Sequence, residues 1–229
     1  MSSLPRISFV VEGITDFIVL DALVDRFLGG IDYVPTQIQP QNSEFLNGLG
    51  PLGGGWKGVL KWCDNISNST DGFIESIVIA NCEYLVIHVD SDIALEPELA
   101  SLGLSQPCPP ARNACDGIRA HLVSLLGGAL PTTVLICVPA QCTEAWIFAA
   151  MHPVEVAKFE PFECRAEPDR LLIGKSSRLV RGKDGAAKKQ PVQYRAFAAR
   201  IAAGWQNAVD LCPEAARFDS EARAAFKVT

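Results

Sequence analysis

The apolar segment YLVIHV at residues 84–89 constrains the fold most, because two carboxylates follow it at once. Aliphatic and β-branched residues without polar alternation are typical of a parallel strand that is buried on both faces. Asp90 and Asp92 come directly after this segment, in the order D-S-D. In open α/β sheets, functional groups lie past the carboxyl ends of the strands. The segment therefore predicts both a parallel sheet and an acidic site at its edge.

Two other apolar segments also run into acids. Residues 7–11, ISFVV, precede Glu12, and residues 132–138, TTVLICV, come shortly before Glu144. Helical periodicity between such strands is typical of right-handed βαβ units. The further predicted elements are a weaker strand at 32–40, a short helix at 59–66, and helices at 16–28, 112–128, 143–151, 192–205 and 213–226. The pattern predicts the α/β class, with a mostly parallel sheet flanked by helices.

The acids at the strand ends suggest a metal site. Parallel strands bring their carboxyl ends to one edge, where like charges repel unless a cation lies between them. The strand period of two predicts that Asp90 and Asp92 point to the same face. Carboxylate oxygens suit Mg²⁺ or Mn²⁺. Asp16, four residues after Glu12, either joins this site or caps the following helix, and Glu144 is the last candidate metal ligand.

Two motifs carry a resemblance to a known family. VVEGITD at 10–16 contains E-G-x-T-D after a first strand, and VIHVDSD at 86–92 contains D-x-D after a later one. In this order they resemble the TOPRIM domain of topoisomerases, primases and OLD-type nucleases. CTEAWI at 142–147 is similar to a later acidic position of small stand-alone TOPRIM proteins. The resemblance covers residues 6 to about 150, and Asp16 matches the acid that joins the metal site in the OLD-type branch.

The resemblance implies a Mg²⁺- or Mn²⁺-dependent endonuclease that hydrolyses phosphodiester bonds. Glu12, Asp90 and Asp92 would hold the ions and carry the catalysis, and a lysine of the basic segment would neutralise transition-state charge; the candidates are Lys183, Lys188 and Lys189. Glu12 acts instead as a general acid or base in the topoisomerase branch. The implied role is the effector of an antiviral defence system that works with a separate ATPase. A metal-dependent phosphatase and a non-catalytic binding module for nucleic acid or a protein partner remain alternatives.

The resemblance also suggests how the chain is organised. Residues 1–155 would form the TOPRIM-like catalytic domain, with a Gly-rich insertion at about 40–70. Residues 156–229 would form a basic loop and a C-terminal helical appendage that packs on the domain. The long separation of Glu12 from Asp90 is the reason for expecting an insertion.

Charge is distributed unevenly along the chain. The formal net charge is −6, whereas residues 165–200 hold ten Lys or Arg against three acids, a net of +7, so the remainder carries −13. A basic segment on an acidic body is typical of a phosphate-binding surface. Nucleic acid is therefore the expected partner, with DNA favoured over RNA. The competing interpretation is a solvated loop whose lysines only improve solubility.

Composition excludes several other classes of protein. The chain is 48% hydrophobic and 20% charged, as in globular domains, and contains no run of about 18 uncharged apolar residues that would predict a membrane span. The start lacks the features of a secretory signal, so a cytoplasmic location is expected. The eight cysteines include no C-x-x-C pair and are expected to be reduced. His88 and Trp146 are expected to pack in the core, and a homo-oligomer is compatible with the sequence.

Overall fold

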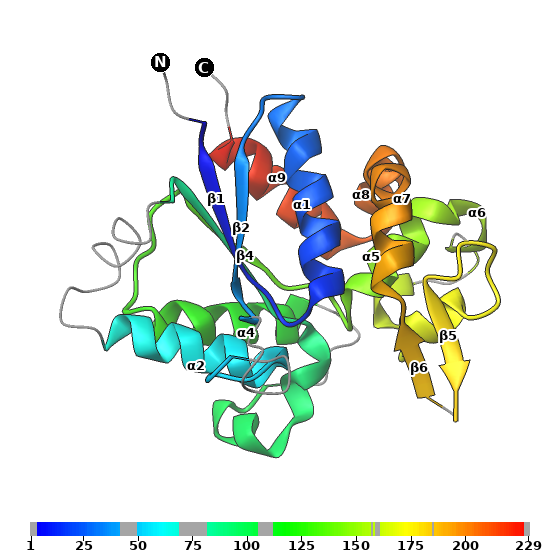
Figure 1. Cartoon of the computed structure of the whole chain (residues 1–229). Coiled ribbons are helices and arrows are strands. Elements are labelled where there is room, and N and C mark those ends of the chain that lie inside the picture. Colours follow the sequence, from blue (N-terminus) through cyan, green and yellow to red (C-terminus); the bar gives the residue numbers. More distant parts are fainter. Residues whose placement is uncertain are drawn as a thin grey trace.

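The computed structural model describes residues 4–41, 50–68, 82–104, 112–156, 158, 161–184 and 186–226. A four-stranded sheet lies at its centre, in the order β2-β1-β3-β4. The strands are β1 (Arg6–Val10), β2 (Val34–Gln39), β3 (Tyr84–His88) and β4 (Val134–Cys137). All three neighbouring pairs are parallel (Figure 1). The predicted α/β class with a parallel sheet is confirmed.

Helices connect and cover these strands. The α-helices are α1 (Ile14–Leu28), α2 (Gly55–Ser67), α4 (Arg112–Leu125), α5 (Thr143–Met151), α6 (Pro153–Val156), α7 (Pro191–Ala203), α8 (Trp205–Leu211) and α9 (Pro213–Ala225). The 3-10 helices are η1 (Ser91–Leu95), η2 (Pro97–Leu102), η3 (Phe162–Cys164) and η4 (Pro168–Leu172). Among the described helices, none is long and apolar enough to cross a membrane.

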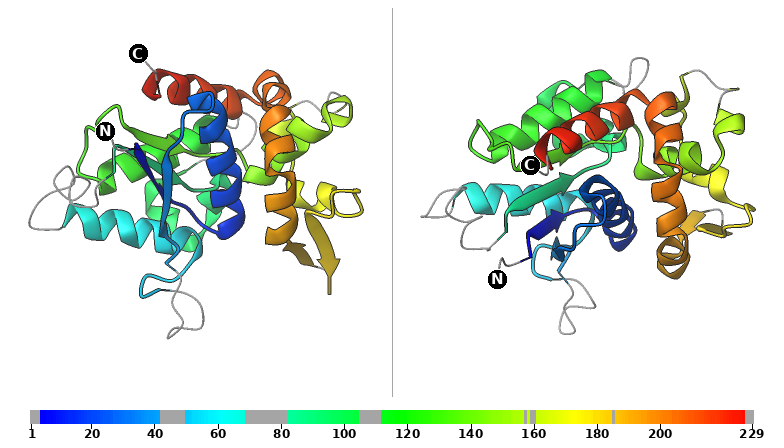
Figure 2. Two further views of the ribbon diagram at one scale, coloured as in Figure 1. Left: turned by 45° about the horizontal axis from the view of Figure 1, so that its top comes forward. Right: turned by 90° about the horizontal axis from the view of Figure 1, so that it is seen from above.

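The sheet separates two hydrophobic cores. Because successive side chains of a strand point to opposite faces, Phe9 and Val86 pack with α1, α5 and the C-terminal helices, whereas Val10 and Ile87 pack with α2 and α4. In both views of Figure 2, α7 and α8 lie at one end of the molecule beside α1. The sheet is thus buried on both faces, as its continuous apolar strands require.

The Gly-rich stretch near residue 55 contributes to the core. Its helix α2 joins β2 to β3 and buries Val59, Trp62 and Cys63 against the sheet. The structure thus makes this part of the predicted insertion a crossover helix; residues 42–49 and 69–70 lie outside the described residues. The C-terminal helices α7, α8 and α9 share one core with α1 and α5, so these helices pack on the sheet domain directly.

The basic segment departs from the loop expected for it. It contains an antiparallel hairpin of β5 (Val180–Lys183) and β6 (Ala186–Lys189), which Figure 1 shows apart from the main sheet. Among the described cysteines, six are free, as expected, but Cys164 is disulfide-bonded. Trp146 is buried as predicted, and its indole N–H donates to Glu163 at 2.9 Å.

Candidate active site

An acidic cleft lies at the carboxyl edge of the sheet, as the sequence predicted. It encloses about 440 Å³. β1 and β3 are adjacent, so the residues that follow them meet although 78 positions separate Glu12 from Asp90. The loop before η4 forms the opposite wall. The cleft is lined by Glu12, Asp90, Asp92, Gln141, Cys142, Glu144, Ala166, Glu167, Pro168, Asp169 and Lys189.

Glu12 is fixed between two loops. Its Oε1 accepts a hydrogen bond from the Asp90 backbone N–H at 2.7 Å, and its backbone carbonyl accepts one from Gly55 at 2.9 Å. Burial first, and then the negative charge of Asp90, raise the pKa of Glu12 to about 8. The fold thus holds Glu12 where its ionised form is unfavourable. A bound cation would stabilise that ionised form.

Residues of α5 and β3 hold the side chain of Asp90 in place. Its Oδ1 accepts hydrogen bonds from the backbone N–H of Thr143 at 3.0 Å and from the Thr143 hydroxyl at 3.3 Å. The same oxygen lies 3.1 Å from Nε2 of His88, which is completely buried. Burial lowers the pKa of His88, but the charge of Asp90 outweighs it and raises the value to about 9. His88 is thus buried as expected, and it also positions Asp90, which the sequence did not indicate.

Asp92 reaches the cleft by a different route from the one predicted. The strand ends at His88, and Asp92 lies in the first turn of η1, so the alternation of strand side chains does not apply to it. The Asp92 backbone N–H donates to Gln141 at 3.1 Å, which fixes the turn beside β4. Its side chain is exposed at the mouth of the cleft. Partial desolvation at this mouth, and then the charge of Asp90, raise its pKa to about 7.

Asp16 lies in the first turn of α1 and is buried. The N-cap residue of the helix is Gly13, so Asp16 does not occupy the N-cap position and lies instead in the first turn, where its charge favours the helix end. A Cβ on Gly13 would lie 3.3 Å from Asp16 Oδ2, so glycine is the residue that lets this carboxylate approach the backbone closely. Asp16 Oδ1 is buried and accepts no hydrogen bond from the described residues.

Glu144 is held in an ion pair on the cleft floor. It lies in the first turn of α5 and is completely buried. Its Oε2 is 2.8 Å from Nζ of Lys189, and its Oε1 accepts a hydrogen bond from the Tyr194 hydroxyl at 2.7 Å. Lys189 Nζ also lies 4.0 Å from Asp16 Oδ1. Both oxygens of Glu144 are engaged, so its predicted place among the metal ligands would require Lys189 to move.

Lys189, rather than Lys183 or Lys188, enters the cleft. Burial lowers its pKa, but the charges of Glu144, Asp16 and Asp90 raise it well above the usual range, so the ammonium stays charged. Lys188, the preceding residue on β6, points to the opposite face of the hairpin, which it shares with Lys183 of β5. Both are exposed and line no part of the cleft. The expectation that these two lysines reach the acids fails because of strand alternation.

The side chains of the cleft fit a divalent cation. Glu12, His88 and Asp90 each offer one ligand atom, and these atoms lie within 4.8 Å of one another. The Asp16 oxygen that accepts no hydrogen bond and the raised pKa of Glu12 indicate crowded carboxyl groups whose joint ionisation a bound cation would favour. Glu12 and Asp90 are the best-placed ligands, with Asp16 and Asp92 beside them. Oxygen ligands of this kind are those that Mg²⁺ and Mn²⁺ prefer.

Comparison with known proteins adds no family. The chain matches no protein-family model, no curated protein and no solved structure. Its fold and cleft define a class only: an α/β protein with an acidic site at the carboxyl edge of a parallel sheet, to which a separate hairpin contributes one lysine.

Proposed function

We propose that this protein is a Mg²⁺- or Mn²⁺-dependent nuclease that hydrolyses phosphodiester bonds in this cleft. The observation that carries the proposal is the meeting of Glu12, Asp90 and Asp92 with the charged Lys189 in one cleft. Carboxylates that hold a cation, next to a fixed ammonium, suit a substrate whose transition state gathers negative charge on phosphate oxygens. The TOPRIM resemblance of the E-G-x-T-D and D-x-D motifs supports the same reaction.

Each residue then has a defined task. Glu12 and Asp90 hold the cation, Asp92 faces the substrate side, and His88 keeps Asp90 in position. When bound, the cation supplies Lewis acidity and charge neutralisation at the scissile phosphate. Lys189 donates hydrogen bonds to phosphate oxygens as their charge grows, because Glu144, itself held by the Tyr194 hydroxyl, fixes it at the cleft floor. Because these contacts are made before substrate binds, they need little reorganisation during the reaction.

The first test is cleavage by the purified full chain. We expect supercoiled plasmid, linear duplex DNA or RNA to be cleaved with Mg²⁺ or Mn²⁺ and to remain intact in EDTA. Asp90→Asn should abolish cleavage. Asp25→Asn, at an exposed position of α1 outside the cleft, is the matched control and should cleave like the wild type.

Two outcomes would contradict the proposal. Cleavage by Asp90→Asn at the wild-type rate would show that the activity arises elsewhere. Metal-dependent hydrolysis of p-nitrophenyl phosphate, with all three nucleic acids left intact, would favour the phosphatase alternative. Calorimetric titration with Mn²⁺ provides a readout besides activity, since Asp90→Asn should lose the binding that Asp25→Asn retains.

A further inference from the structure

The β5–β6 hairpin has two chemically different faces. Its register pairs Val180 with Lys189 and Arg181 with Lys188. Directly paired residues lie on the same face of an antiparallel ladder, and residues two positions apart share it. One face therefore carries Val180, which is buried, and Lys189, which enters the cleft. The other carries Arg181, Lys183 and Lys188, and we call these three residues the outer basic face.

The cations of the outer basic face have no counter-charges among the residues that the structure describes. Within the described ranges, no carboxylate lies within ion-pair distance of Arg181, Lys183 or Lys188, and all three are exposed. Arg181 and Lys188 are directly opposite each other on a short ladder. Like charges in this position destabilise a strand pair. The hairpin thus keeps a repulsion that a polyanion on this face would remove.

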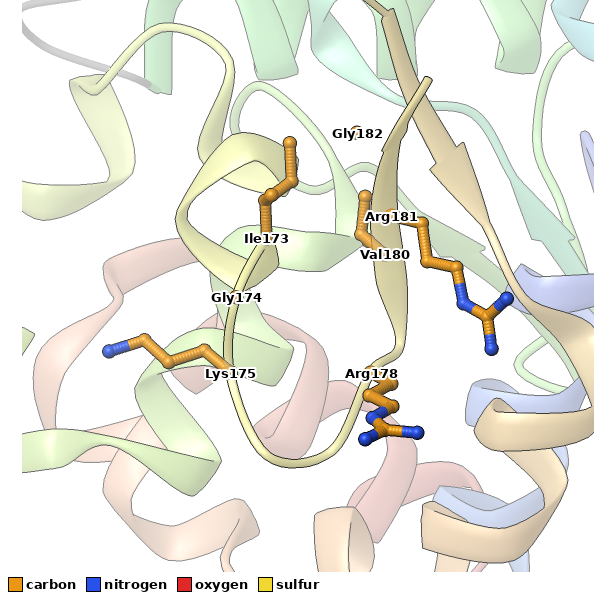
Figure 3. A pocket seen from close by; sticks show the side chains of 7 residues that line it. All are labelled: Ile173, Gly174, Lys175, Arg178, Val180, Arg181 and Gly182. Atoms are coloured by element: carbon orange, nitrogen blue, oxygen red, sulfur yellow. The ribbon is translucent and has the colours of Figure 1, made fainter.

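A fourth cation extends the outer basic face around the preceding turn. Arg178 and Arg181 line a hollow of about 500 Å³ together with Ile173, Gly174, Lys175, Val180 and Gly182. Figure 3 shows both guanidinium groups directed to the same side of the hollow, whereas Lys175 points the other way. Lys175 is already paired with Glu155 at 2.7 Å. Arg178 is exposed and has no such partner among the described residues.

We propose that Arg178, Arg181, Lys183 and Lys188 form a binding track for the phosphodiester backbone of nucleic acid. The inference rests on the proposed function, because it names how the substrate of the same cleft is held. Lys188 adjoins Lys189 in the chain, so the track ends one residue away from the cation that faces the acids, on the other face of the same strand. The rest of the chain repels polyanions, and the track supplies sequence-independent attraction that positions a phosphate at the cleft.

The test is binding without metal, so that no cleavage occurs. Fluorescence anisotropy with a labelled 30-base-pair duplex in EDTA is measured from 50 to 300 mM salt, for the wild type and for Arg181→Gln/Lys183→Gln/Lys188→Gln. Each lost phosphate contact lowers the slope of log K against log salt by roughly 0.9. We expect the slope to fall by about 2 to 3, and the affinity at 100 mM salt to fall at least about tenfold.

The matched control removes three charges elsewhere. Arg6, Arg26 and Lys61 are exposed; Arg6 and Arg26 lie at the opposite end of the sheet from the cleft, and Lys61 lies on α2. Arg6→Gln/Arg26→Gln/Lys61→Gln changes the net charge equally and should retain most of the affinity and slope. Equal losses in the two triple variants would overturn the track, as would an unchanged slope in the hairpin variant or no duplex binding by the wild type.

Two further measurements test whether the hairpin variant is folded and whether its cleft still binds metal. Circular dichroism and Mn²⁺ titration should be the same for the hairpin variant and the wild type, because none of its substituted residues lines the cleft. If the triple variant were misfolded, the single variant Lys183→Glu would replace it, with the same expected direction. Salt-dependent duplex binding lost in the hairpin variant, but without cleavage by the wild type in Mg²⁺ or Mn²⁺, would refute the nuclease and leave the track standing.

Discussion

Lys188 and Lys189 are neighbours in the sequence, yet they belong to opposite electrostatic environments. Lys189 is about one-third exposed and is paired with Glu144, which Tyr194 holds in turn, whereas Lys188 is exposed and has no counter-ion among the described residues. The same contrast separates the cleft from the outer basic face. Charged groups in the cleft are mutually fixed, so removing one disturbs several others. Charged groups of the outer face have no counter-ion among the described residues, so removing one of them leaves no buried partner unpaired.

The largest effect is expected from substitution of Asp90 or Glu12 in the cleft. Both variants should lose cleavage, but their free energies of unfolding should differ. Asp90→Ala leaves the buried His88 without the carboxylate that raises its pKa, and two Thr143 donors without their acceptor. It should abolish cleavage and cost about 2–4 kcal/mol in the free energy of unfolding. Glu12→Gln also abolishes cleavage but keeps an oxygen for the Asp90 N–H, and it should be neutral or stabilising at pH 8.

Urea denaturation in EDTA at pH 8 measures this difference. Asp25→Asn is again the control and should unfold like the wild type. Equal stability of the two cleft variants would mean that the His88–Asp90 contact contributes nothing to the free energy of unfolding. It would also refute the statement that the charged groups of the cleft fix one another. Detectable cleavage by Glu12→Gln would remove Glu12 from the metal site.

A smaller effect is expected from substitution of Lys189 or Lys188. The first substitution should change kcat, and the second should change KM. Lys189→Met should lower kcat by roughly 10²–10³-fold, as loss of a preorganised donor does elsewhere. It should also destabilise the fold, by less than the ~3–5 kcal/mol of a fully buried pair, because Lys189 is about one-third exposed. Lys188→Met should raise KM and leave kcat close to that of the wild type.

A double variant separates charge from packing. Lys189→Met/Glu144→Gln removes the ion pair as a unit, so it should recover stability without recovering kcat. Lys61→Met, an exposed lysine of α2, is the control for both constants. If Lys188→Met lowered kcat as much as Lys189→Met does, the separation of the two hairpin faces would be refuted.

Local pattern made the acidic edge predictable. Apolar segments ending in Glu12 and Asp90 indicate parallel strands, and parallel strands bring their ends together whatever lies between them. The partners of these acids were not predictable, because Thr143 meets Asp90 across 53 residues through a fold-dependent contact. Nothing in the spacing of His88 marks it as a support for Asp90 rather than an ordinary core residue.

The hairpin was missed for a different reason. VRGK and AAKK show no apolar alternation, because only Val180 of the eight residues is fully buried and the pair is joined to no larger sheet. Two adjacent lysines at 188 and 189 must point to opposite faces of a strand, but the sequence does not indicate which one points inward. That choice is made by the Glu144 carboxylate, which lies 45 residues earlier at the start of α5.

The smallest predicted effect is a pH dependence confined to the cleft. The pKa of Glu12 is raised from 4.5 to about 8, so between these values the folded protein holds a proton that the unfolded chain has lost. Stability therefore falls as pH rises through this window. Asp92, raised from 3.8 to about 7, and His88, raised from 6.5 to about 9, change stability in the same direction.

In EDTA, the melting temperature of the wild type should fall by several degrees from pH 5 to pH 9. Glu12→Gln should fall less, because one of these protons is gone, whereas the outer-face triple variant should keep the full wild-type decline. Added Mn²⁺ takes the place of the protons, so its stabilising effect should grow with pH. A melting temperature that rises between pH 5 and pH 9, or an undiminished decline in Glu12→Gln, would mean that the acids of the cleft are not held together against their own repulsion.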